Sequence, residues 1–497
     1  DGDDHAATQW QVDDHSDFLS PEFDSNPDSA NLLSIVVPRQ KLRLATFYHW
    51  RVRHQDQAGG WSEWSEPKTF TTLSVEGLIV PEDYPTIQAA IDAATDGDTI
   101  TVTPGDYEED VRLHGKNVLV TSLDPMDSII VEQTKIAGTV IFSGTETEEC
   151  VLQGFTITAD SEIAPGIYNR SRLRGCKPTI QFNRIVNNSG SIGDCYGVIR
   201  GNLIQFNGSG LVRCGGVIED NQILGNVDPY GGGLSDCDGT IRRNLIADNF
   251  AFGAFGTFPH LELIGRGGAF YECDGLIENN VIVGNEAEED GSGFYLCDGT
   301  IRNNTIVNNP TKKGQSVFYI CHANISNNIV YQGENESIAD PLVDAQSYVP
   351  FLCLIQGFEG EDSTGNFDLP PLFVDESGRD FHLQPHSPCI DHGGGSGVTE
   401  DYEGNPREVD GTSLQGKFSQ NDVGAYEYQG PYIQAGDLSG NGLLDPLDLF
   451  VFQKDWLGVT NASAPANVNW DDRIDSLDLL ILMREWLETI PGRPYEK

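Results

Sequence analysis

Short apolar runs, broken at regular places by glycine and asparagine, dominate the middle of the chain. The segment CDGTIRNNTIVNN, from Cys297 to Asn309, recurs as CDGLIENNVIVGN from Cys273 and as CDGTIRRNLIADN from Cys237. Looser copies begin at four further cysteines, Cys176, Cys195, Cys214 and Cys321. The cysteines recur at steps of 19 to 36 residues, and self-similarity at such a period indicates a solenoid.

The apolar residues within each copy are short and β-branched rather than helical in spacing. Ile301 and the run Thr305–Val307 stand on either side of Asn304, and no 3.6-residue period is present. This pattern is typical of strands. We therefore predict a mainly β fold, a parallel β-helix whose coils stack at about 4.8 Å.

Stacking in register places like residues on like. The inward isoleucine column is Ile180, Ile199, Ile218, Ile241, Ile277, Ile301 and Ile325. An asparagine column is Asn183, Asn202, Asn221, Asn244, Asn280, Asn304 and Asn328, and a second one runs from Asn188 to Asn309. We expect each asparagine to adopt the left-handed conformation at a bend and to bond through its amide to the asparagine of the next coil.

The residue after each column isoleucine alternates in charge over five coils. The column is Gln181, Arg200, Glu219, Arg242, Glu278, Arg302 and Ser326. Opposite charges above and below each other favour a structural row of ion pairs, each worth about 0–1 kcal/mol when exposed. A charged track for a polymeric ligand is the alternative.

Seven of the ten cysteines fall in one column of the repeat. In-register neighbours sit about a strand spacing apart, which is wider than the roughly 3.5–4.5 Å between β-carbons that a disulfide prefers. We expect a column of buried free thiols. Cys150, Cys353 and Cys389 lie outside it, and a disulfide between the last two stays an open alternative.

Residues 1–73 are predicted to form a separate small β-sandwich. The strand FYHWRVRHQD (Phe47–Asp56) is followed by a Gly-Gly turn and by WSEWS (Trp61–Ser65), and the set resembles a fibronectin type III module. Such a module implies that Arg51 and Arg53 stack with Trp61 and Trp64. The first strand of the module is missing here, so either the chain is cut within it or another chain completes its open edge.

Residues 74–430 are predicted to form the solenoid with its two ends closed. The segment YPTIQAAIDAATDGD (Tyr84–Asp98) predicts an amphipathic helix that caps the first coil. This cap, the coil VLQGFTIT (Val151–Thr158) and the Asn-rich repeats resemble the right-handed parallel β-helix proteins of the pectate-lyase-like superfamily. The resemblance implies a fold, since that group includes lyases, hydrolases, adhesins and non-catalytic surface proteins.

Two segments of the solenoid depart from the repeat. The long insertion after Asn249 is apolar, with interface candidates Phe252, Phe255, Phe258 and Leu261. It either folds back on the solenoid or forms a contact patch or a sugar-stacking platform. The closing segment after Tyr331 resembles that of secreted bacterial β-helix proteins. We expect its polar residues to brace the cap by hydrogen bonds; they are Asp391, His392, Asp401, Arg407 and Asp422.

Residues 431–497 change class and contain two loops with oxygen ligands at EF-hand-like spacing. The first set of candidate calcium ligands is Asp437, Ser439, Asn441, Leu443 (carbonyl), Asp445 and Asp448, and the second is Asn467, Asn469, Asp471, Arg473 (carbonyl), Asp475 and Asp478. Each loop leads into a helix, and the pair resembles a dockerin, which implies a small Ca²⁺-binding α-helical module and a cohesin-like partner. Pro446 and Leu447 stand where cellulosomal dockerins usually carry small hydroxyl residues, so a standard cohesin is a poor match.

The net charge of the chain disfavours some classes of binding partner. The 497 residues carry 76 Asp and Glu against 30 Lys and Arg, a net charge of −46, which disfavours nucleic acid and anionic membranes. No apolar run is long enough to span a bilayer. We therefore expect an extracellular protein, secreted or on the cell surface.

No catalytic cluster stands out, so we assign no catalytic residue. The best carboxylate row is Asp238, Asp274 and Asp298, but each precedes a glycine and is explained as a turn residue. His260 and Arg266 in the insertion are weaker candidates. The favoured function is a non-catalytic extracellular rod that assembles with copies of itself through its terminal modules. The alternative is a polysaccharide lyase or glycoside hydrolase tethered by its dockerin, so polysaccharide is a second possible partner.

Overall fold

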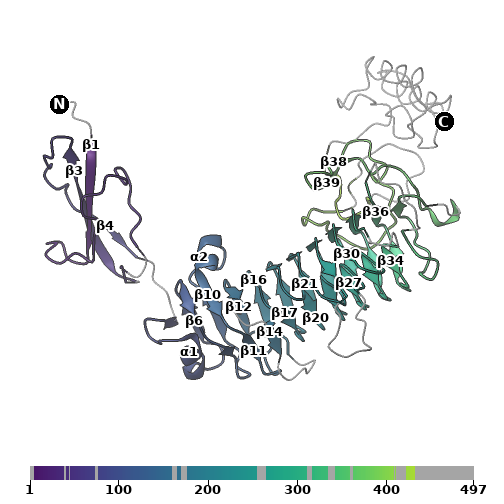
Figure 1. Ribbon diagram of the computed structural model, residues 1–497, viewed down its shortest axis with the longest axis horizontal. Helices are drawn as coiled ribbons and strands as arrows, with labels where there is room; N and C mark the ends of the chain where they lie inside the picture. Colours follow the sequence, from purple (N-terminus) through teal and green to yellow (C-terminus); the bar gives the residue numbers. More distant parts are fainter. Residues whose placement is uncertain are drawn as a thin grey trace, which may run out of the picture.

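The computed structural model describes residues 5–38, 41–43, 45–72, 77–158, 165–169, 176–253, 265–310, 316–333, 342–358, 362–407, 409 and 421–430. The long central part is a parallel β-helix, with the N-terminal module at one end and the closing segment at the other (Figure 1). The predicted calcium module, residues 431–497, lies outside the described residues, as does the domain boundary predicted at residues 73 and 74. Among the described residues, no helix is long and apolar enough to cross a membrane.

The coils build three parallel sheets of eleven, eleven and nine strands, and the coils between the two ends contribute one strand to each. The first sheet comprises β5 (Leu78–Val80), β6 (Thr99–Val102), β9 (Leu119–Ser122), β12 (Val151–Gln153), β15 (Thr179–Gln181), β18 (Val198–Arg200), β21 (Val217–Glu219), β24 (Thr240–Arg242), β28 (Leu276–Glu278), β32 (Thr300–Arg302) and β35 (Asn324–Ser326). The second comprises β7 (Gly105–Tyr107), β10 (Thr134–Ala137), β13 (Thr156–Thr158), β16 (Arg184–Val186), β19 (Leu203–Gln205), β22 (Gln222–Leu224), β25 (Leu245–Ala247), β29 (Val281–Val283), β33 (Thr305–Val307), β36 (Ile329–Tyr331) and β37 (Leu354–Ile355). The third comprises β8 (Val111–Arg112), β11 (Val140–Phe142), β14 (Pro165–Asn169), β17 (Gly190–Gly193), β20 (Leu211–Val212), β23 (Leu234–Ser235), β27 (Phe270–Tyr271), β31 (Phe294–Tyr295) and β34 (Phe318–Tyr319).

The predicted isoleucine column is confirmed as the core beneath the first sheet. Its register is one to one, as in Ile218↔Ile241 and Ile277↔Ile301, and its members are almost fully buried. Burying one such side chain contributes about 1.5–3 kcal/mol, so the column is a main source of stability.

Both asparagine columns are also confirmed, with one correction. The Asn221 N–H and Nδ2 each donate to Asn244 Oδ1 at 3.0 Å, and the same pattern links the other coils. The left-handed residue is not the ladder asparagine but the one before it, such as Asp220 (φ 57°) or Asn279 (φ 53°). The bend therefore comes first, and the asparagine after it satisfies the backbone groups that the bend exposes.

The charged side chains of the predicted column form separate arginine–glutamate pairs and not a continuous row of ion pairs. Arg242 Nη2 lies 2.8 Å from Glu219 Oε2, and Arg302 Nη2 lies 2.8 Å from Glu278 Oε2. Arg200 Nε instead donates to Gln181 Oε1 at 2.7 Å. The polar side chains of this face bond to one another, in agreement with the structural interpretation.

All ten cysteines are buried free thiols, as predicted for the column. The Cys214 N–H donates to Cys237 Sγ at 3.4 Å, so the thiols take part in the stacking. Cys353 and Cys389 do not form the disulfide left open above, because they lie in separate apolar clusters. Burial raises the pKa of Cys353 to about 12, which keeps this thiol protonated.

Helix α1 (Ile87–Ala93) closes the first coil as predicted. Thr86 Oγ1 accepts the Ala89 N–H at 3.0 Å, and the Glu109 carboxylate accepts the N–H groups of Ile87 and Gln88, both at 2.9 Å. Lys116 Nζ donates to the carbonyls of Ile91 and Ala94 at the other end. Both ends of the short helix are thus satisfied. A second helix, α2 (Ser128–Gln133), stands beside β10.

The closing segment packs on the outer face of the second sheet at its C-terminal end. It contains the 3₁₀ turn η1 (Asp362–Thr364) and the hairpin of β38 (Phe373–Asp375) and β39 (Asp380–Leu383). Phe373, Phe381 and Tyr428 form one apolar cluster with Val283 and Val307 of the solenoid. A small parallel pair, β26 (Phe250–Ala251) and β30 (Glu286–Ala287), borders the second and third sheets.

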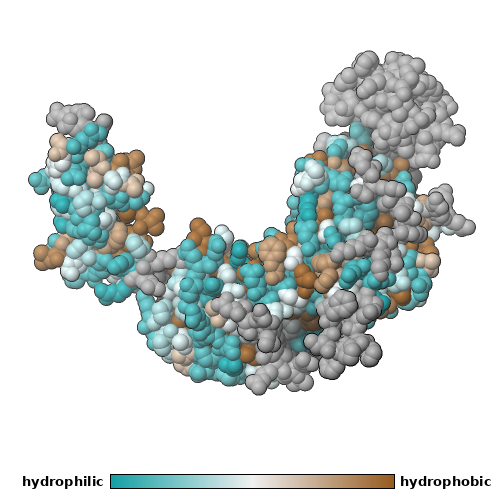
Figure 2. All heavy atoms as spheres, viewed as in Figure 1, coloured by the Kyte–Doolittle hydropathy of each residue, from teal (hydrophilic) through white to brown (hydrophobic). Residues whose placement is uncertain are grey.

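The N-terminal module contains one four-stranded antiparallel sheet, in the order β2 (Phe23–Asp24), β1 (His5–Asp13), β3 (Phe47–Asp56) and β4 (Lys68–Thr71). Val12, Phe23 and Tyr48 form its core, against which Ile35, Val37 and Leu42 pack. Apolar surface remains visible on this module in Figure 2 and includes the exposed side chains of Leu19, Leu33 and Val36.

The predicted arginine–tryptophan stack is present in this module. Arg51 Cζ lies 4.4 Å from the ring centroid of Trp64, and Arg53 Cζ lies 4.5 Å from that of Trp61. Phe18, on the other side of Arg51 at 4.2 Å, extends the stack beyond the prediction.

Candidate functional site

The three faces of the solenoid differ in how their outward side chains are used. On the first sheet the charged side chains pair with one another, and on the second sheet the closing segment covers the C-terminal coils. The third sheet instead presents tyrosines on three successive coils. This face has the aromatic and charged composition of a ligand-binding surface.

The tyrosines stack in register. The ring centroids of Tyr271 (β27) and Tyr295 (β31) are 5.4 Å apart with an interplanar angle of 3°, and those of Tyr295 and Tyr319 (β34) are 5.5 Å apart. The preceding residue on each strand, such as Phe270 or Phe294, points inward and is fully buried. The strand alternation therefore turns each tyrosine away from the core. Tyr271 and Tyr319 are half-buried, whereas Tyr295 between them is only 6% exposed.

Tyr230 adds a fourth ring beside the row, although Ser235 and not Tyr230 is the register partner of Tyr271. It precedes β23, and its ring centroid lies 5.1 Å from that of Tyr271. Tyr230, Arg266 and Asp290 occupy equivalent positions on three successive coils, because the N–H groups of Gly231 and Gly267 donate to the carbonyls of Arg266 and Asp290, respectively. The aromatic, the cation and the carboxylate thus form a second row beside the tyrosines.

Arg266, the middle residue of this second row, stacks on a tyrosine ring but does not use all of its hydrogen-bond donors. Its Cζ lies 5.2 Å from the ring centroid of Tyr295. Its Nε is buried and has no hydrogen-bond partner among the described residues. A buried guanidinium N–H costs free energy unless it is bonded, so this atom favours an oxygen-bearing ligand.

Two carboxylates lie beside this row. Burial raises the pKa of the Asp228 carboxyl to about 6, although Oδ1 accepts the Tyr230 N–H at 2.8 Å. Burial, followed by a hydrogen bond to Glu272, raises the pKa of Tyr271. Hereafter the tyrosine face means Tyr230, Tyr271, Tyr295 and Tyr319 together with Arg266, Asp228, Glu272 and Asp290.

The sequence predicted only part of this face. Arg266, a weak candidate, lies at its centre, whereas His260 lies outside the described residues. The tyrosines were missed, although the dipeptide Phe-Tyr stands two residues before Cys273, Cys297 and Cys321 and could have shown the row.

The carboxylates of Asp238, Asp274 and Asp298 behave as the turn interpretation predicts. Asp238 Oδ1 accepts the Asp274 N–H at 3.2 Å, and Asp274 Oδ1 accepts the Asp298 N–H at 2.8 Å. Each is exposed and holds the next coil. This row is therefore a structural element.

The interface candidates of the insertion are mostly outside the described residues. Phe252 is 45% exposed, and its ring centroid lies 5.6 Å from that of Phe250. Phe255, Phe258 and Leu261 are not among the described residues, and the same holds for every candidate calcium ligand of the tail. The calcium prediction and the contact-patch prediction therefore stay predictions.

The polar residues of the closing segment are braces, as expected. Arg407 is fully buried and lies 3.1 Å from Glu427 Oε2. Its Nη2 also donates to Asn279 Oδ1 of the solenoid at 2.8 Å. The sequence prediction missed Glu427, whose pKa burial raises to about 7.

Asp422 and Asp401 complete the bracing. The Asp422 carboxylate accepts the N–H groups of Asp391 (2.7 Å) and Tyr428 (2.6 Å), and Asp401 Oδ1 accepts that of Asn405 (2.8 Å). Burial lowers the pKa of His392, the remaining member of the predicted set, to about 4. These contacts fix the closing segment and leave little of it for chemistry.

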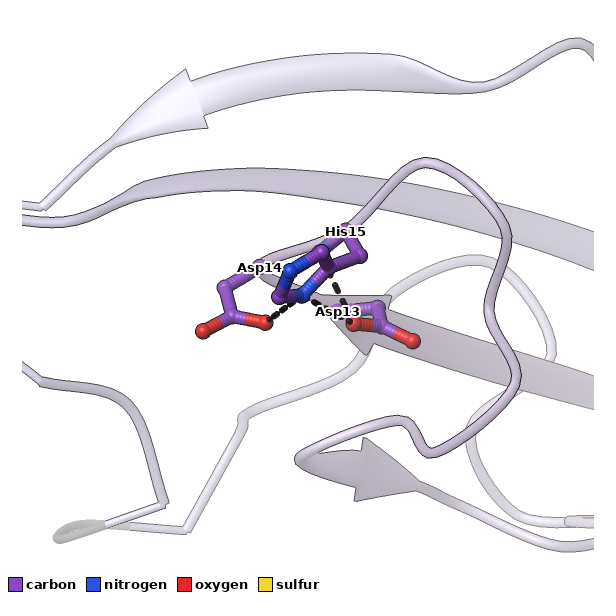
Figure 3. A group of neighbouring side chains, drawn as sticks. All are labelled: Asp13, Asp14 and His15. Atoms are coloured by element: carbon purple, nitrogen blue, oxygen red, sulfur yellow. Dashed lines mark hydrogen bonds and ion pairs between the residues drawn. The ribbon is translucent and has the colours of Figure 1, made fainter.

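One group of three acidic and histidine side chains among the described residues has spacing that a cation could use. The group consists of Asp13, which is the last residue of β1, and of Asp14 and His15, which follow it (Figure 3). His15 Nδ1 lies 2.5 Å from Asp14 Oδ1 and 4.0 Å from Asp13 Oδ1, and the His15 side chain is 76% exposed. Asp13 Oδ1 accepts the His15 N–H at 2.9 Å, so the arrangement is that of an ordinary turn.

Comparison with known proteins places the N-terminal module. Residues 2–75 match the family described as "Rha78A-like, N-terminal immunoglobulin domain". The module is therefore similar to an immunoglobulin domain rather than shown to be of the fibronectin type. No curated protein matches the chain in sequence.

Among solved structures, one match is the "Structure of Yersinia enterocolitica Family 28 Exopolygalacturonase". The identity is 10%, the match covers 72% of this chain and 87% of that chain, and the TM-score is 0.20. So low a score carries no argument about activity. The β-helix of this chain rests on its own strand pairing.

Proposed function

We propose that the solenoid acts on an acidic polysaccharide, which it binds on the tyrosine face and cleaves as a glycoside hydrolase. The observation that carries this proposal is the guanidinium of Arg266, which lies against Tyr295 in a row of aromatic side chains. Its buried Nε has no hydrogen-bond partner within the part of the chain that the structure describes. Arginine beside aromatic rings suits a carboxylate-bearing sugar, because the guanidinium bonds the carboxylate and the aromatic groups contact the sugar ring.

The geometry of the row suits a polymer. The tyrosines repeat at 5.4 and 5.5 Å along the solenoid axis, and each offers a phenolic hydroxyl that can donate and accept. Several coils can therefore hydrogen-bond successive sugar units.

Asp228 is the proposed general acid. A carboxyl with a pKa of about 6 keeps a substantial protonated fraction in mildly acidic solution, as glycosidic bond cleavage requires. The second carboxylate of such a reaction would come from Glu272 or Asp290 on the neighbouring coils.

The non-catalytic rod remains a hypothesis that no observation on the described residues favours. Calcium binding by residues 431–497, a cohesin-like partner, self-assembly and an extracellular location are likewise kept as proposals. They are compatible with a polysaccharide-acting protein, since a tethering module would hold such an enzyme near its substrate.

The test is a degradation and binding assay with the full chain. Polygalacturonate and alginate serve as acidic probes and a neutral β-glucan as control, with new reducing ends and retardation in affinity gels as readouts. We expect the wild type to release reducing ends from one acidic polymer, Asp228→Asn to lose this activity, and Asp238→Asn to keep it. Absence of cleavage, together with equal retardation of wild type and Arg266→Gln, would overturn the proposal.

A further inference from the structure

Two histidines on the two central strands of the N-terminal sheet, β1 and β3, bring their ring nitrogens together. His5 Nε2 lies 3.0 Å from His54 Nδ1, and the two rings meet edge to face with centroids 4.4 Å apart. Neither histidine was a candidate in the sequence, because they lie 49 residues apart.

The strand pairing explains how they meet. Strand β1 pairs with β3 so that Thr8 is the partner of His54, and the register shifts between His5 and Ala7. A shift of this kind re-aims a side chain. It lets the ring of His5 lie over Thr8 and reach the ring of His54.

Thr8 adds a third electron-rich atom. Its Oγ1 lies 2.7 Å from His5 Nε2 and 3.3 Å from His54 Nδ1, and it donates its hydroxyl hydrogen to Leu32 O at 2.8 Å. Because that hydrogen is committed to Leu32, the oxygen turns its lone pairs toward the histidines. His5 Nε2 also lies 3.1 Å from the Ala7 carbonyl oxygen, which only accepts, so without a metal this nitrogen carries the ring hydrogen. A bound metal would take the place of that hydrogen, and the atoms His5 Nε2, His54 Nδ1 and Thr8 Oγ1 would then form a triangle around it.

This triangle has the dimensions of a metal site. Imidazole nitrogens bind Zn²⁺ at about 2.0–2.1 Å, which places two nitrogens of one ion roughly 3 Å apart. The His54 side chain is exposed, so an ion and its waters can reach the site.

We propose that His5, His54 and Thr8 form a binding site for a divalent transition metal of the Zn²⁺, Co²⁺ or Ni²⁺ type. The two imidazoles are the principal ligands, the threonine oxygen orients them and lies within reach of the ion, and water completes the coordination. The site is separate from the tyrosine face and from the calcium loops proposed in the tail. Imidazole ligands suit these metals, whereas calcium prefers oxygen ligands.

The test is metal titration of the full chain in the presence of saturating Ca²⁺, with Zn²⁺ followed by calorimetry and Co²⁺ by its visible absorption. The variants are His5→Gln and His54→Gln, and the controls are His49→Gln on the same strand β3 and His15→Gln in the turn of Figure 3. We expect one Zn²⁺ per chain for the wild type, an affinity at least tenfold lower in either ligand variant, and unchanged affinity in both controls.

Thermal unfolding without metal, measured on each variant, shows whether the module still folds. Folded ligand variants that bind Zn²⁺ as tightly as the wild type would overturn the proposal. So would absence of Zn²⁺ binding by the wild type, or loss of binding in His15→Gln instead. A module that unfolds in one ligand variant leaves the other variant and the Co²⁺ spectrum of the wild type to decide.

Discussion

Among the described residues, arginine stacks against aromatic rings in two places, and the two stacks differ in how the arginine is bonded. In the N-terminal module, Arg51 Nε and Nη2 donate to Gln11 Oε1 at 2.9 and 2.7 Å. Arg53 donates in the same way to Gln9, and the Asp24 carboxylate holds both glutamine amides. On the tyrosine face, Arg266 keeps a buried Nε without a partner among the described residues.

The contrast separates a structural stack from a binding one. A closed network lowers the free energy of the folded module, because each buried polar group is paired. An open one leaves a buried donor unpaired, at a cost that a ligand recovers on binding. We therefore assign stability to the stack of Arg51 and Arg53 and function to Arg266.

The largest expected effect is on catalysis. Asp228→Asn removes the proposed acid while keeping the shape of the side chain, so the rate of polysaccharide cleavage should fall by about 10²–10⁴-fold. Reducing-end assays at pH 5 give the rate, and the unfolding midpoint should not fall. Retention of more than a tenth of the activity would remove Asp228 from this role.

The second prediction tests whether the stack of Arg51 and Arg53 stabilises the N-terminal module. Arg51→Ala leaves Gln11 and Phe18 without their partner and Trp64 with Arg53 alone, and we expect the N-terminal module to lose about 2–3 kcal/mol of stability. Glycan cleavage should be unchanged. Urea unfolding followed by tryptophan fluorescence measures this, because Trp61 and Trp64 report on the stack. A loss below about 0.5 kcal/mol would contradict the closed network.

The third prediction is the reverse of the second, a loss of ligand affinity without a loss of stability. Arg266→Gln should lower the affinity for an acidic oligosaccharide at least about tenfold, since a charge-assisted hydrogen bond is worth about 1.5–3 kcal/mol. Stability should change by less than about 0.5 kcal/mol. Calorimetry with a uronate oligosaccharide is the measurement, and a neutral oligosaccharide is its control. If stability falls and affinity does not, Arg266 is structural after all.

A fourth prediction concerns pH. The pKa of Asp228 is raised to about 6 from 3.8, so the folded state binds more protons than the unfolded state between those values. Its contribution to stability is present below pH 4 and is lost as the pH rises through 6. The rate of cleavage should also fall as the pH rises above 6, because Asp228 then loses the proton that it donates. Asp228→Asn should remove this dependence of stability, and an unaltered pH profile in that variant would contradict the assignment.

The smallest expected effect is at the end of the row. Tyr319→Phe removes one hydroxyl and keeps the ring stacked on Tyr295, so we expect about a two- to fivefold loss of affinity, which is the worth of one neutral hydrogen bond. Tyr48→Phe is not a matched control, because its hydroxyl accepts the Arg43 N–H in the N-terminal module. Tyr402→Phe in the closing segment serves instead and should leave affinity unchanged.

The repeat explains why much of the fold could be read from the sequence. Isoleucine and asparagine occupy fixed places in each copy, so a constant register converts a sequence column into a spatial one, as in Ile218↔Ile241. The left-handed position was misplaced by one residue, because Asn221 and Asp220 are both turn formers and only the hydrogen bonds distinguish them. The strand Phe47–Asp56 of the N-terminal module was anticipated from its alternation, but the described residues form one four-stranded sheet and not the two sheets of the predicted sandwich. The similarity to an immunoglobulin domain was not anticipated.

The candidate site could be predicted less well. Tyr230, Arg266 and Asp290 share a column only because linkers of different length bring them to the same place on successive coils. No constant spacing in the sequence marks them. The raised pKa of Asp228 depends on burial by segments around it, which no local pattern reveals.

The most direct test of the account is hydrogen–deuterium exchange of the full chain with and without an acidic oligosaccharide. We expect protection confined to peptides that cover residues 228–235, 265–272, 290–296 and 317–321, with no change over Trp61–Ser65 of the N-terminal module. Protection of the exposed turns at Asp238, Asp274 and Asp298 in place of these peptides, or no protection anywhere at saturating ligand, would contradict the claim that the tyrosine face is the polysaccharide site.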